Sequence, residues 1–281
     1  MCGAVTVFAM LDSTAKYLAG ELGVPVAQVI WLRFFIHAVL SILILLPLLG
    51  KQGFVSAKPG HQLLRSVLLA TTTAFNFAAV KYLRLDQTVT IFFLPPLLVA
   101  AWAGPILGEW VGWRRLLAIL TGFIGVIFVT RPGFGGIHWA VLFSFGATLT
   151  YALYGIHTRY LTGHDRSEVN IFYTAIAGAV LGAPFGLAAW VWPQDTLTWG
   201  LFAWTGITGL VGHWLLVLAY KRAPAPVVTP FVYFGLIPMI LLGFTVFGDV
   251  PDVWTLLGGG IVIGSGLYLY VRERRLESGS G

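Results

Sequence analysis

The residues of this chain that could do chemistry are polar side chains spaced for one helix face inside very apolar segments. Asp12 and Lys16 are four residues apart, so in a helix they lie on the same face and can form an ion pair. Polar groups are costly in hydrocarbon and usually face a bundle interior or a water-filled cavity. We therefore expect a substrate cavity lined by Asp12, Lys16, Asn76, Phe92, Pro95, Trp102, Tyr154, His157, His213 and Tyr233.

Plainer roles are open to several of these residues. Asp12 is the acid placed most deeply in an apolar segment, and an unpaired buried carboxylate is very unfavourable, so it either pairs with Lys16 or takes up a proton. Lys16 can also extend to the membrane interface. His157 and His213 can be interior histidines without a ligand, and Arg33 and His37 can simply tether neighbouring helices.

Motifs of known enzyme classes are absent from the sequence. It has no H-E-x-x-H, G-x-S-x-G, P-loop or C-x-x-C pattern, so we expect no catalytic residues, no metal site and no cofactor. The single cysteine, Cys2, excludes an internal disulfide. A membrane enzyme and a receptor or structural subunit remain the alternatives to a small-molecule carrier.

The elements that must position the polar residues are membrane helices. The chain is 58% hydrophobic and 10% charged, whereas a soluble domain has about 25% charged residues. About 20 apolar residues span a bilayer as a helix. Such segments predict an all-α integral membrane protein with ten transmembrane helices, near 1–20, 26–49, 63–83, 87–107, 113–131, 137–160, 169–192, 199–220, 226–247 and 252–271.

Positive charge is distributed unevenly over the connections between these helices. Three residues, Lys81, Arg84 and Arg131, fall on one side, and twelve fall on the side of both termini: Lys51, Lys58, Arg65, Arg114, Arg115, Arg159, Arg166, Lys221, Arg222, Arg272, Arg274 and Arg275. Lysine and arginine are retained in the cytoplasm, so we expect both termini there. The net charge of +6 therefore needs no nucleic-acid partner. Glu109, Arg114 and Arg115 are expected to form a structural clamp at a tight turn.

The chain also matches itself. At an offset of 140, Ala79 and Lys81 fall on Ala219 and Lys221, and Gly108-Glu109 falls on Gly248-Asp249. Chance similarity between apolar helices is the alternative, but the matches include charged and glycine positions. We expect a first five-helix repeat at 1–133, a second at 134–275 and an appended tail at 276–281. Because five is odd, the second repeat would be inverted around a central cavity. At an offset of 143, which matches Lys16-Tyr17-Leu18 to Arg159-Tyr160-Leu161, the residue opposite Asp12 is Gly155, and this favours simple ion pairing for Asp12.

Prolines interrupt the fourth helix of each expected repeat. Pro95 and Pro96 lie opposite Gly235, with Pro238 just beyond. Proline removes a helical hydrogen bond, which would free the carbonyls of Ile91, Phe92 and Phe234 for a substrate ammonium or water. We expect Pro95, Pro96, Gly235 and Pro238 to act as hinges, the alternative being packing kinks without ligand contact.

Glycines at helical spacing predict close helix packing. Gly178, Gly182 and Gly186 form one such face, and Gly260 with Gly264 repeats the spacing. Small residues let transmembrane helices approach closely. Packing inside one chain is the simpler interpretation, and a homodimer seam is the other.

Longer motifs resemble a known family. The sequences GEWVGWRR (108–115) and TGFIGVIFVTRPG (121–133), with FAMLDSTAKYL (8–18), are similar to EamA-type drug/metabolite transporters. The resemblance implies ten helices in two inverted repeats, alternating access, small-molecule substrates, lipid surroundings, and a monomer or homodimer in the bacterial inner membrane. Family members include exporters of amino acids, so export of amino acids, possibly aromatic ones, is the expected function.

Overall fold

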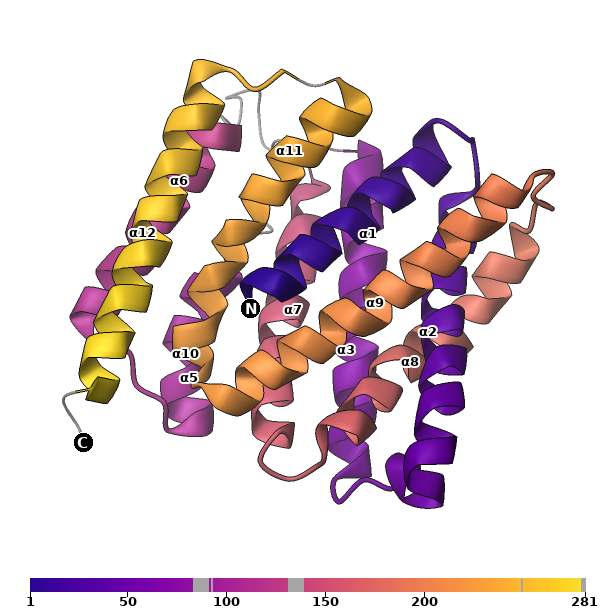
Figure 1. Ribbon diagram of the computed structural model, residues 1–281, viewed down its shortest axis with the longest axis horizontal. Coiled ribbons are helices and arrows are strands. Elements are labelled where there is room, and N and C mark those ends of the chain that lie inside the picture. The colour runs from indigo at the N-terminus through magenta and orange to yellow at the C-terminus, as the bar shows by residue number, and fades with distance from the viewer. Residues whose placement is uncertain (83–90, 92, 131–138, 249, 279–281) are drawn as a thin grey trace. The chain divides into compact units, whose positions relative to one another are not determined.

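The structure is a computed structural model that describes residues 1–82, 91, 93–130, 139–248 and 250–278. Its elements are helical throughout this described part, without a strand. They are α1 (Cys2–Gly20), α2 (Val26–Leu49), η1 (Gly50–Phe54), α3 (Pro59–Tyr82), α5 (Pro95–Leu107), α6 (Trp113–Thr130), α7 (Val141–Leu161), α8 (Ser167–Ala188), α9 (Thr196–Arg222), α10 (Ala225–Val228), η2 (Thr229–Gly235), α11 (Leu236–Phe247) and α12 (Val253–Ser278) (Figure 1).

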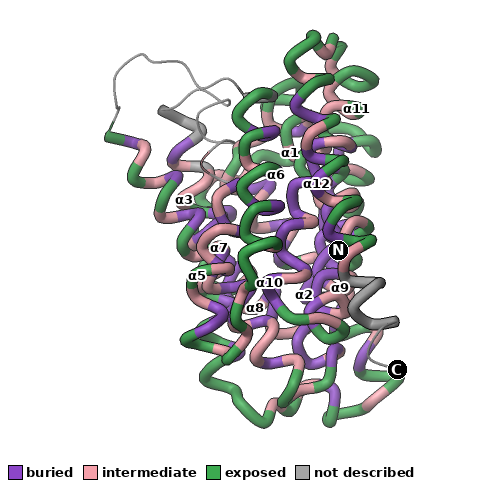
Figure 2. Tube along the Cα trace, turned by 90° about the vertical axis from the view of Figure 1, so that its left-hand side faces the viewer, coloured by how far each residue is buried: buried purple, intermediate pink, exposed green. Residues whose placement is uncertain are grey.

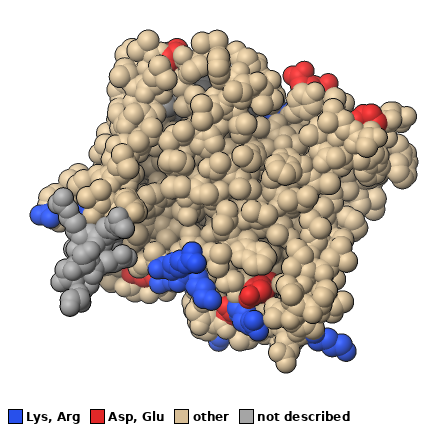
Figure 3. Space-filling view, viewed as in Figure 1, with Lys and Arg blue, Asp and Glu red and all other residues tan. Residues whose placement is uncertain are grey.

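Five of the described helical segments are long and apolar enough to cross a membrane. They are Val26–Phe54, Ser167–Ala188, Thr196–Arg222, Ala225–Phe247 and Val253–Arg272. Many large apolar side chains on these helices are exposed, and the face in Figure 3 carries few charged atoms. Exposed apolar faces of this extent suit lipid rather than water. The chain is therefore a multi-pass helical membrane protein, as its composition predicted.

The chain forms two compact units. Unit 1 comprises Gly3–Thr73 and His157–Arg222, with Met1; unit 2 comprises Ala74–Ile156 and Ala223–Gly281, with Cys2. Helices α3 and α7 contribute to both units. Neither unit coincides with a predicted repeat, because compactness groups helices from both halves of the sequence. In each unit the helices carry buried and exposed faces, as the alternating colours along α6 show (Figure 2).

In unit 1, helix α2 packs against α8 and α9. A Cβ at Gly178 would lie 2.3 Å from the ring of Phe34, and one at Gly186 would lie 2.5 Å from Trp31. Only glycine permits contacts this short, since any side chain would overlap the rings. The glycine face of α8 therefore packs inside the chain, which confirms the simpler interpretation of that face.

In unit 2, helix α6 lies beside α12 (Figure 1). A Cβ at Gly125 would lie 2.8 Å from the carbonyl oxygen of Gly258, so the two backbones are nearly in contact. In contrast, a Cβ at Gly260 or Gly264 would meet nothing within 4 Å. The second predicted glycine face thus borders open space rather than a packed helix.

Helices α5 and α11 end in the same way, each at a glycine. Gly108 follows α5 with φ 74° and ψ 8°, and Gly248 follows α11 with φ 73° and ψ 12°. This left-handed conformation favours glycine because a Cβ would clash with the backbone. The Gly-acid match at an offset of 140 therefore corresponds to a pair of equal helix ends.

The second predicted helix break is present, and at the first the described residues show the start of a helix. Helix α5 begins at Pro95, after non-helical Phe93 and Leu94, and proline is favoured in the first turn because its missing N–H has no helical acceptor there. The segment expected as one helix at 226–247 is divided into α10, η2 and α11. A 3₁₀ stretch inside a helix is often a hinge or a strained segment. The structure gives interruptions; their action as hinges stays a prediction.

Other boundaries differ from expectation. Helix α3 begins at Pro59 rather than near residue 63, and α12 continues to Ser278, into the expected tail. Asp195 and Asp252 start α9 and α12, where their carboxylates accept hydrogen bonds from the N–H groups of Thr198 and Thr255 at 2.7 and 2.9 Å. These N-cap carboxylates satisfy backbone N–H groups in the first turn of each helix, and hydropathy alone does not locate such helix starts.

Candidate functional site

Two buried imidazoles lie together in unit 1. The rings of His37 on α2 and His213 on α9 have centroids 6.0 Å apart, and the ring of Phe8 on α1 lies 4.8 Å from that of His213. The His37 ring interacts with the backbone of Ile171 on α8, while its Nε2 atom is buried without a hydrogen-bond partner among the described residues. A buried polar atom without a partner is costly, so this atom is available to a ligand or water.

Glycines on α9 create the room for these rings. A Cβ at Gly206 would lie 2.3 Å from Ile36, and one at Gly212 would lie 2.5 Å from Phe8. Gly209 lies between them along the helix, near Leu11. Because α1 and α2 both approach α9 along this stripe, Phe8, His37 and His213 meet. Gly206, Gly209 and Gly212 are each three residues apart in the sequence, and this spacing was the signal that could have located the site.

A basic residue of α2, Arg33, lies near the imidazoles, and Asp12 of α1 is exposed. Arg33 on α2 is the basic group that acts electrostatically on Asp12 of α1, and it acts on His37 and His213 as well. The sequence favoured Lys16 as the partner of Asp12. Lys16 is exposed on the same helix, and its pairing with Asp12 stays a prediction. The structure adds Arg33, whose expected role was a helix tether, to the surroundings of Asp12.

In unit 2, Tyr233 is buried in the 3₁₀ segment that interrupts the predicted ninth helix. It lies in η2, with its ring against Gly122 of α6, where a Cβ would approach it to 2.6 Å. The ring of Phe93 lies 6.0 Å away. The Tyr233 hydroxyl is buried without a hydrogen-bond partner in the described part of the chain. It is therefore a second group that a ligand could satisfy.

The remaining predicted cavity residues are distributed over the units as follows. Asp12, Lys16, His157 and His213 belong to unit 1, whereas Asn76, Pro95, Trp102, Tyr154 and Tyr233 belong to unit 2. Tyr154 is fully buried on α7 and stacks on Tyr151 at 6.0 Å, and His157 lies 5.6 Å from the ring of His61. Asn76 and Trp102 are half-buried. Phe92 lies outside the described residues, as do Arg84 and Arg131.

The carbonyl of Ile91 is not free for a substrate, as the sequence had suggested. It accepts a hydrogen bond from the Leu94 N–H at 3.0 Å, and the Thr148 hydroxyl of α7 lies 2.9 Å from it. The same hydroxyl lies 2.8 Å from the Ser144 carbonyl, and its single proton serves one of them at a time. The expectation for Ile91 was wrong because a neighbouring helix satisfies the group that proline leaves without a helical partner.

Glu109 joins the end of α5 to the start of α10. Its carboxylate accepts a hydrogen bond from the Ala225 N–H at 2.6 Å. The sequence had grouped Glu109 with Arg114 and Arg115, and Arg114 is exposed, with its guanidinium 5.3 Å from the Trp113 ring. Glu109 thus holds the start of the interrupted helix, although Ala225 is 116 residues away in sequence.

A buried polar network in unit 1 has no counterpart among the predicted sites. Arg65 of α3 is fully buried and donates to the Asn170 carbonyl, to Thr174 Oγ1 at 2.7 Å and to Thr158 Oγ1 at 3.4 Å. The sequence had assigned Arg65 to a basic loop. That assignment was wrong because the Arg65 side chain is turned inwards, towards Thr158 of α7 and Asn170 and Thr174 of α8, rather than into a loop.

The network extends from Arg65 to the loops at the same helix ends. Gln62 Nε2 lies 2.6 Å from Asn170 Oδ1 and 2.7 Å from Asp165 Oδ2. Asp165 also accepts from the Ser56 hydroxyl at 2.5 Å and the Ala57 N–H at 2.7 Å. Burial acts to raise the pKa of this carboxyl, but these hydrogen bonds outweigh it and lower the pKa below its usual value. The network therefore fastens the η1–α3 loop to the α7–α8 loop.

Known proteins provide an independent comparison. The chain matches the EamA-like transporter family over residues 1–131 and 138–271. A solved structure, described as a crystal structure of a protein, superposes with a TM-score of 0.80 at 18% identity, covering 97% of this chain and 95% of the other. At that identity the likeness concerns the fold.

Curated relatives carry several transport names. A riboflavin transporter of Vibrio cholerae is 29% identical, covering 91% of this chain and 86% of the relative. An S-adenosylmethionine uptake transporter of Rickettsia prowazekii is 24% identical (95% and 90%), and a pseudopaline exporter of Pseudomonas aeruginosa is 22% identical (91% and 89%). These relatives are named as transporters, and none of the three is named for amino acids.

Proposed function

Because this chain belongs to the EamA-like transporter family, we propose that it is a secondary transporter of a small, flat, aromatic metabolite of the riboflavin kind. The proposal is supported by the riboflavin transporters of Vibrio cholerae and Rhizobium johnstonii, which are 29% and 27% identical to it. Amino acids, which the sequence favoured, are the second class to test. Relatives are named for both uptake and export, so direction is part of the same test.

The observation that carries this proposal is the buried ring cluster of Phe8, His37 and His213 in unit 1. Its rings offer faces on which a planar heterocycle can stack, and His37 Nε2 offers a hydrogen-bonding atom that no described protein group uses. The isoalloxazine ring system of riboflavin is planar, and its edges carry imide and carbonyl groups. Polar groups inside membrane helices are generally functional rather than structural.

The mechanism we propose is alternating access by two inverted repeats, with both termini in the cytoplasm. Equal glycine ends at Gly108 and Gly248 support equivalence of the two repeats. The burial of Arg65 removes one charge from the cytoplasmic set, and the remaining eleven still outnumber the three on the other side. Asp12, next to Arg33, is the acid through which transport could couple to protons.

The substrate prediction is tested with purified protein in liposomes. Riboflavin should accumulate or exchange, whereas phenylalanine and tryptophan should do so at least tenfold more slowly, which corresponds to about 1.4 kcal/mol in transition-state binding. His37→Phe keeps an aromatic ring but removes both ring nitrogens, Nε2 and the one that faces the Ile171 backbone, so the rate of riboflavin transport per folded protein should fall by a similar factor. Lys58→Ala, at an exposed residue, is the matched control.

Two outcomes would contradict the substrate assignment, and a third would contradict proton coupling. Faster transport of amino acids than of riboflavin would return the protein to the class that the sequence favoured. Full activity of His37→Phe would separate transport from the ring cluster. Equal rates with and without a pH gradient would exclude proton coupling through Asp12 and leave facilitated diffusion.

The hinge proposal concerns the start of α5. Pro96 is buried in the first turn of that helix, and restoring an N–H there would let the α-helix extend backwards through Leu94. Pro96→Ala should therefore lower the transport rate by about tenfold while the yield of folded protein falls by less than about twofold. Pro105→Ala, also in α5 but away from the break, is the control. Equal losses of rate and yield in Pro96→Ala would favour a packing kink.

A further inference from the structure

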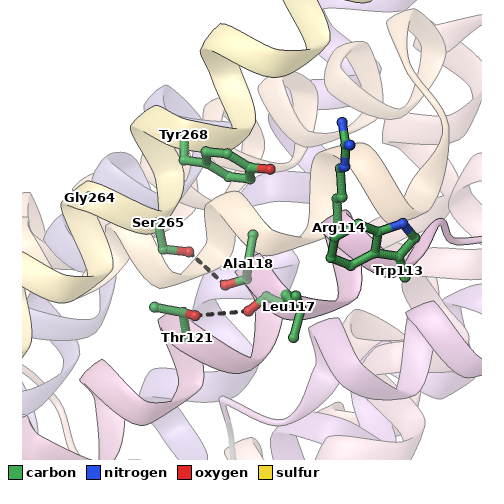
Figure 4. A pocket seen from close by; sticks show the side chains of 8 residues that line it. All are labelled: Trp113, Arg114, Leu117, Ala118, Thr121, Gly264, Ser265 and Tyr268. Atoms are coloured by element: carbon green, nitrogen blue, oxygen red, sulfur yellow. Dashed lines mark hydrogen bonds between the residues drawn. The ribbon is translucent and has the colours of Figure 1, made fainter.

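A groove on unit 2 lies apart from the residues used above. It has a volume of about 330 Å³ and runs between the first half of α6 and the middle of α12 (Figure 4). The groove is lined by Arg114 and Thr121 of α6 and by Gly264 and Ser265 of α12. The lining is completed by Trp113, Leu117, Ala118 and Tyr268. None of these eight residues is acidic.

The floor of the groove is chemically apolar, although it contains two hydroxyl groups. Ser265 donates to the Ala118 carbonyl at 2.7 Å, and Thr121 donates to the Leu117 carbonyl at 2.9 Å, as the dashed lines in Figure 4 show. Both hydroxyl protons are therefore used, that of Ser265 between the two helices and that of Thr121 within α6. Gly264 adds no side chain, and a Cβ there would meet nothing within 4 Å. A flexible hydrocarbon chain suits such a floor better than a polar solute does.

One end of the groove is cationic and aromatic. The Arg114 guanidinium is exposed and lies 5.3 Å from the ring of Trp113. The ring of Tyr268 covers the groove from α12, and its hydroxyl end is directed to the side on which Arg114 stands (Figure 4). Tryptophan and tyrosine favour the membrane–water interface, and arginine is suited to phosphate oxygens because its donors form a planar fork.

We propose that this groove binds one anionic phospholipid. An acyl chain lies along Leu117, Thr121 and Gly264, and the headgroup phosphate accepts hydrogen bonds from Arg114 beside Trp113 and Tyr268. Charge complementarity selects the occupant: the end of the groove is basic and the lining contains no acid, so an anionic headgroup is preferred to a zwitterionic one. The proposal does not rest on the identity of the transported substrate.

Lipid binding is measured by native mass spectrometry of the full chain in detergent. Phosphatidylglycerol should bind more tightly than phosphatidylcholine with the same acyl chains. Arg114→Gln should weaken phosphatidylglycerol about fivefold, the usual effect of one basic residue near an anionic membrane surface, and leave phosphatidylcholine unchanged. Gly264→Leu fills the groove from the other helix and should weaken both lipids. Arg166→Gln, at an exposed arginine of unit 1, should alter neither.

The outcomes separate the possible occupants. Equal affinity for the two lipids, or phosphatidylglycerol binding that survives both Arg114→Gln and Gly264→Leu, would overturn the proposal. A dimer that Gly264→Leu dissociates, without lipid selectivity, would assign the groove to a second copy of the chain. Because the two variants lie on different helices, failure of one to fold leaves the other as the test. Riboflavin transport in phosphatidylcholine liposomes is measured separately, so the two proposals fail independently.

Discussion

Arg65→Ala is expected to cause the largest loss of stability of any single substitution in unit 1. Arg65 is fully buried and donates to the Asn170 carbonyl and to the hydroxyls of Thr158 and Thr174. Removing one partner from a buried ionic network costs roughly 3–5 kcal/mol, since the remaining groups stay buried without their hydrogen bonds. Thermal unfolding in detergent should shift down by roughly 10 °C, given the usual relation between free energy and melting temperature.

Two controls separate this network from general effects of charge. Lys58→Ala removes an exposed lysine just before α3 and should change the melting temperature by no more than about 1 °C, because exposed surface substitutions lie within about 0.5 kcal/mol. Arg65→Lys keeps the charge but lacks the planar fork, so it should fall between alanine and wild type. An Arg65→Ala protein as stable as Lys58→Ala would show that the network contributes little.

Gly178→Ala is expected to have the second largest effect, through steric overlap alone. The added Cβ would lie 2.3–2.7 Å from three ring atoms of Phe34, which is itself buried between α2 and α8. Overpacking of this kind costs about 1–3 kcal/mol, because the helices must separate or the ring must leave its rotamer. We expect the upper end of that range, measured as a lower melting temperature and a lower yield of monodisperse protein.

Gly182→Ala provides a matched control on the same face of α8. A Cβ at Gly182 would lie 3.6 Å from Trp31, an ordinary van der Waals distance. Its effect should stay below about 1 kcal/mol, and alanine is the better helix former. The double variant Phe34→Ala, Gly178→Ala should be more stable than the sum of the single effects predicts, since the clash is absent. Additive losses would contradict direct contact between the two residues.

Some of the fold follows from local sequence. The apolar segments predicted the helices and the membrane because each span needs only its own length and composition. Proline and glycine also gave local boundaries. Pro95 lies in the first turn of α5, where its missing N–H has no helical acceptor, and Gly108 and Gly248 end helices in a left-handed conformation that other residues rarely adopt. The family resemblance likewise rested on contiguous motifs, at 108–115 and 121–133.

The candidate site was predicted only in part. His213 and Tyr233 were expected, since polar residues in apolar helices generally have a role. Arg33 was expected as a tether, and the structure adds it to the electrostatic surroundings of Asp12. Helical spacing shows which residues share a face, but it does not show which residue of another helix approaches that face. The approach of α2 to α9 depends on Gly206 and Gly209, far along the chain.

Sequence by itself determined the helices, their interruptions and the membrane environment of this protein, because each depends on interactions within about one turn or one span. Tertiary structure alone decided the environment of single polar groups. Arg65 reads in sequence as one more basic residue of a cytoplasmic loop, and it becomes a buried donor only because Asn170, 105 residues away, presents its carbonyl there. Likewise Ile91 is satisfied by Thr148 of another helix. Such partners are set by helix packing, which the local pattern of residue types does not encode.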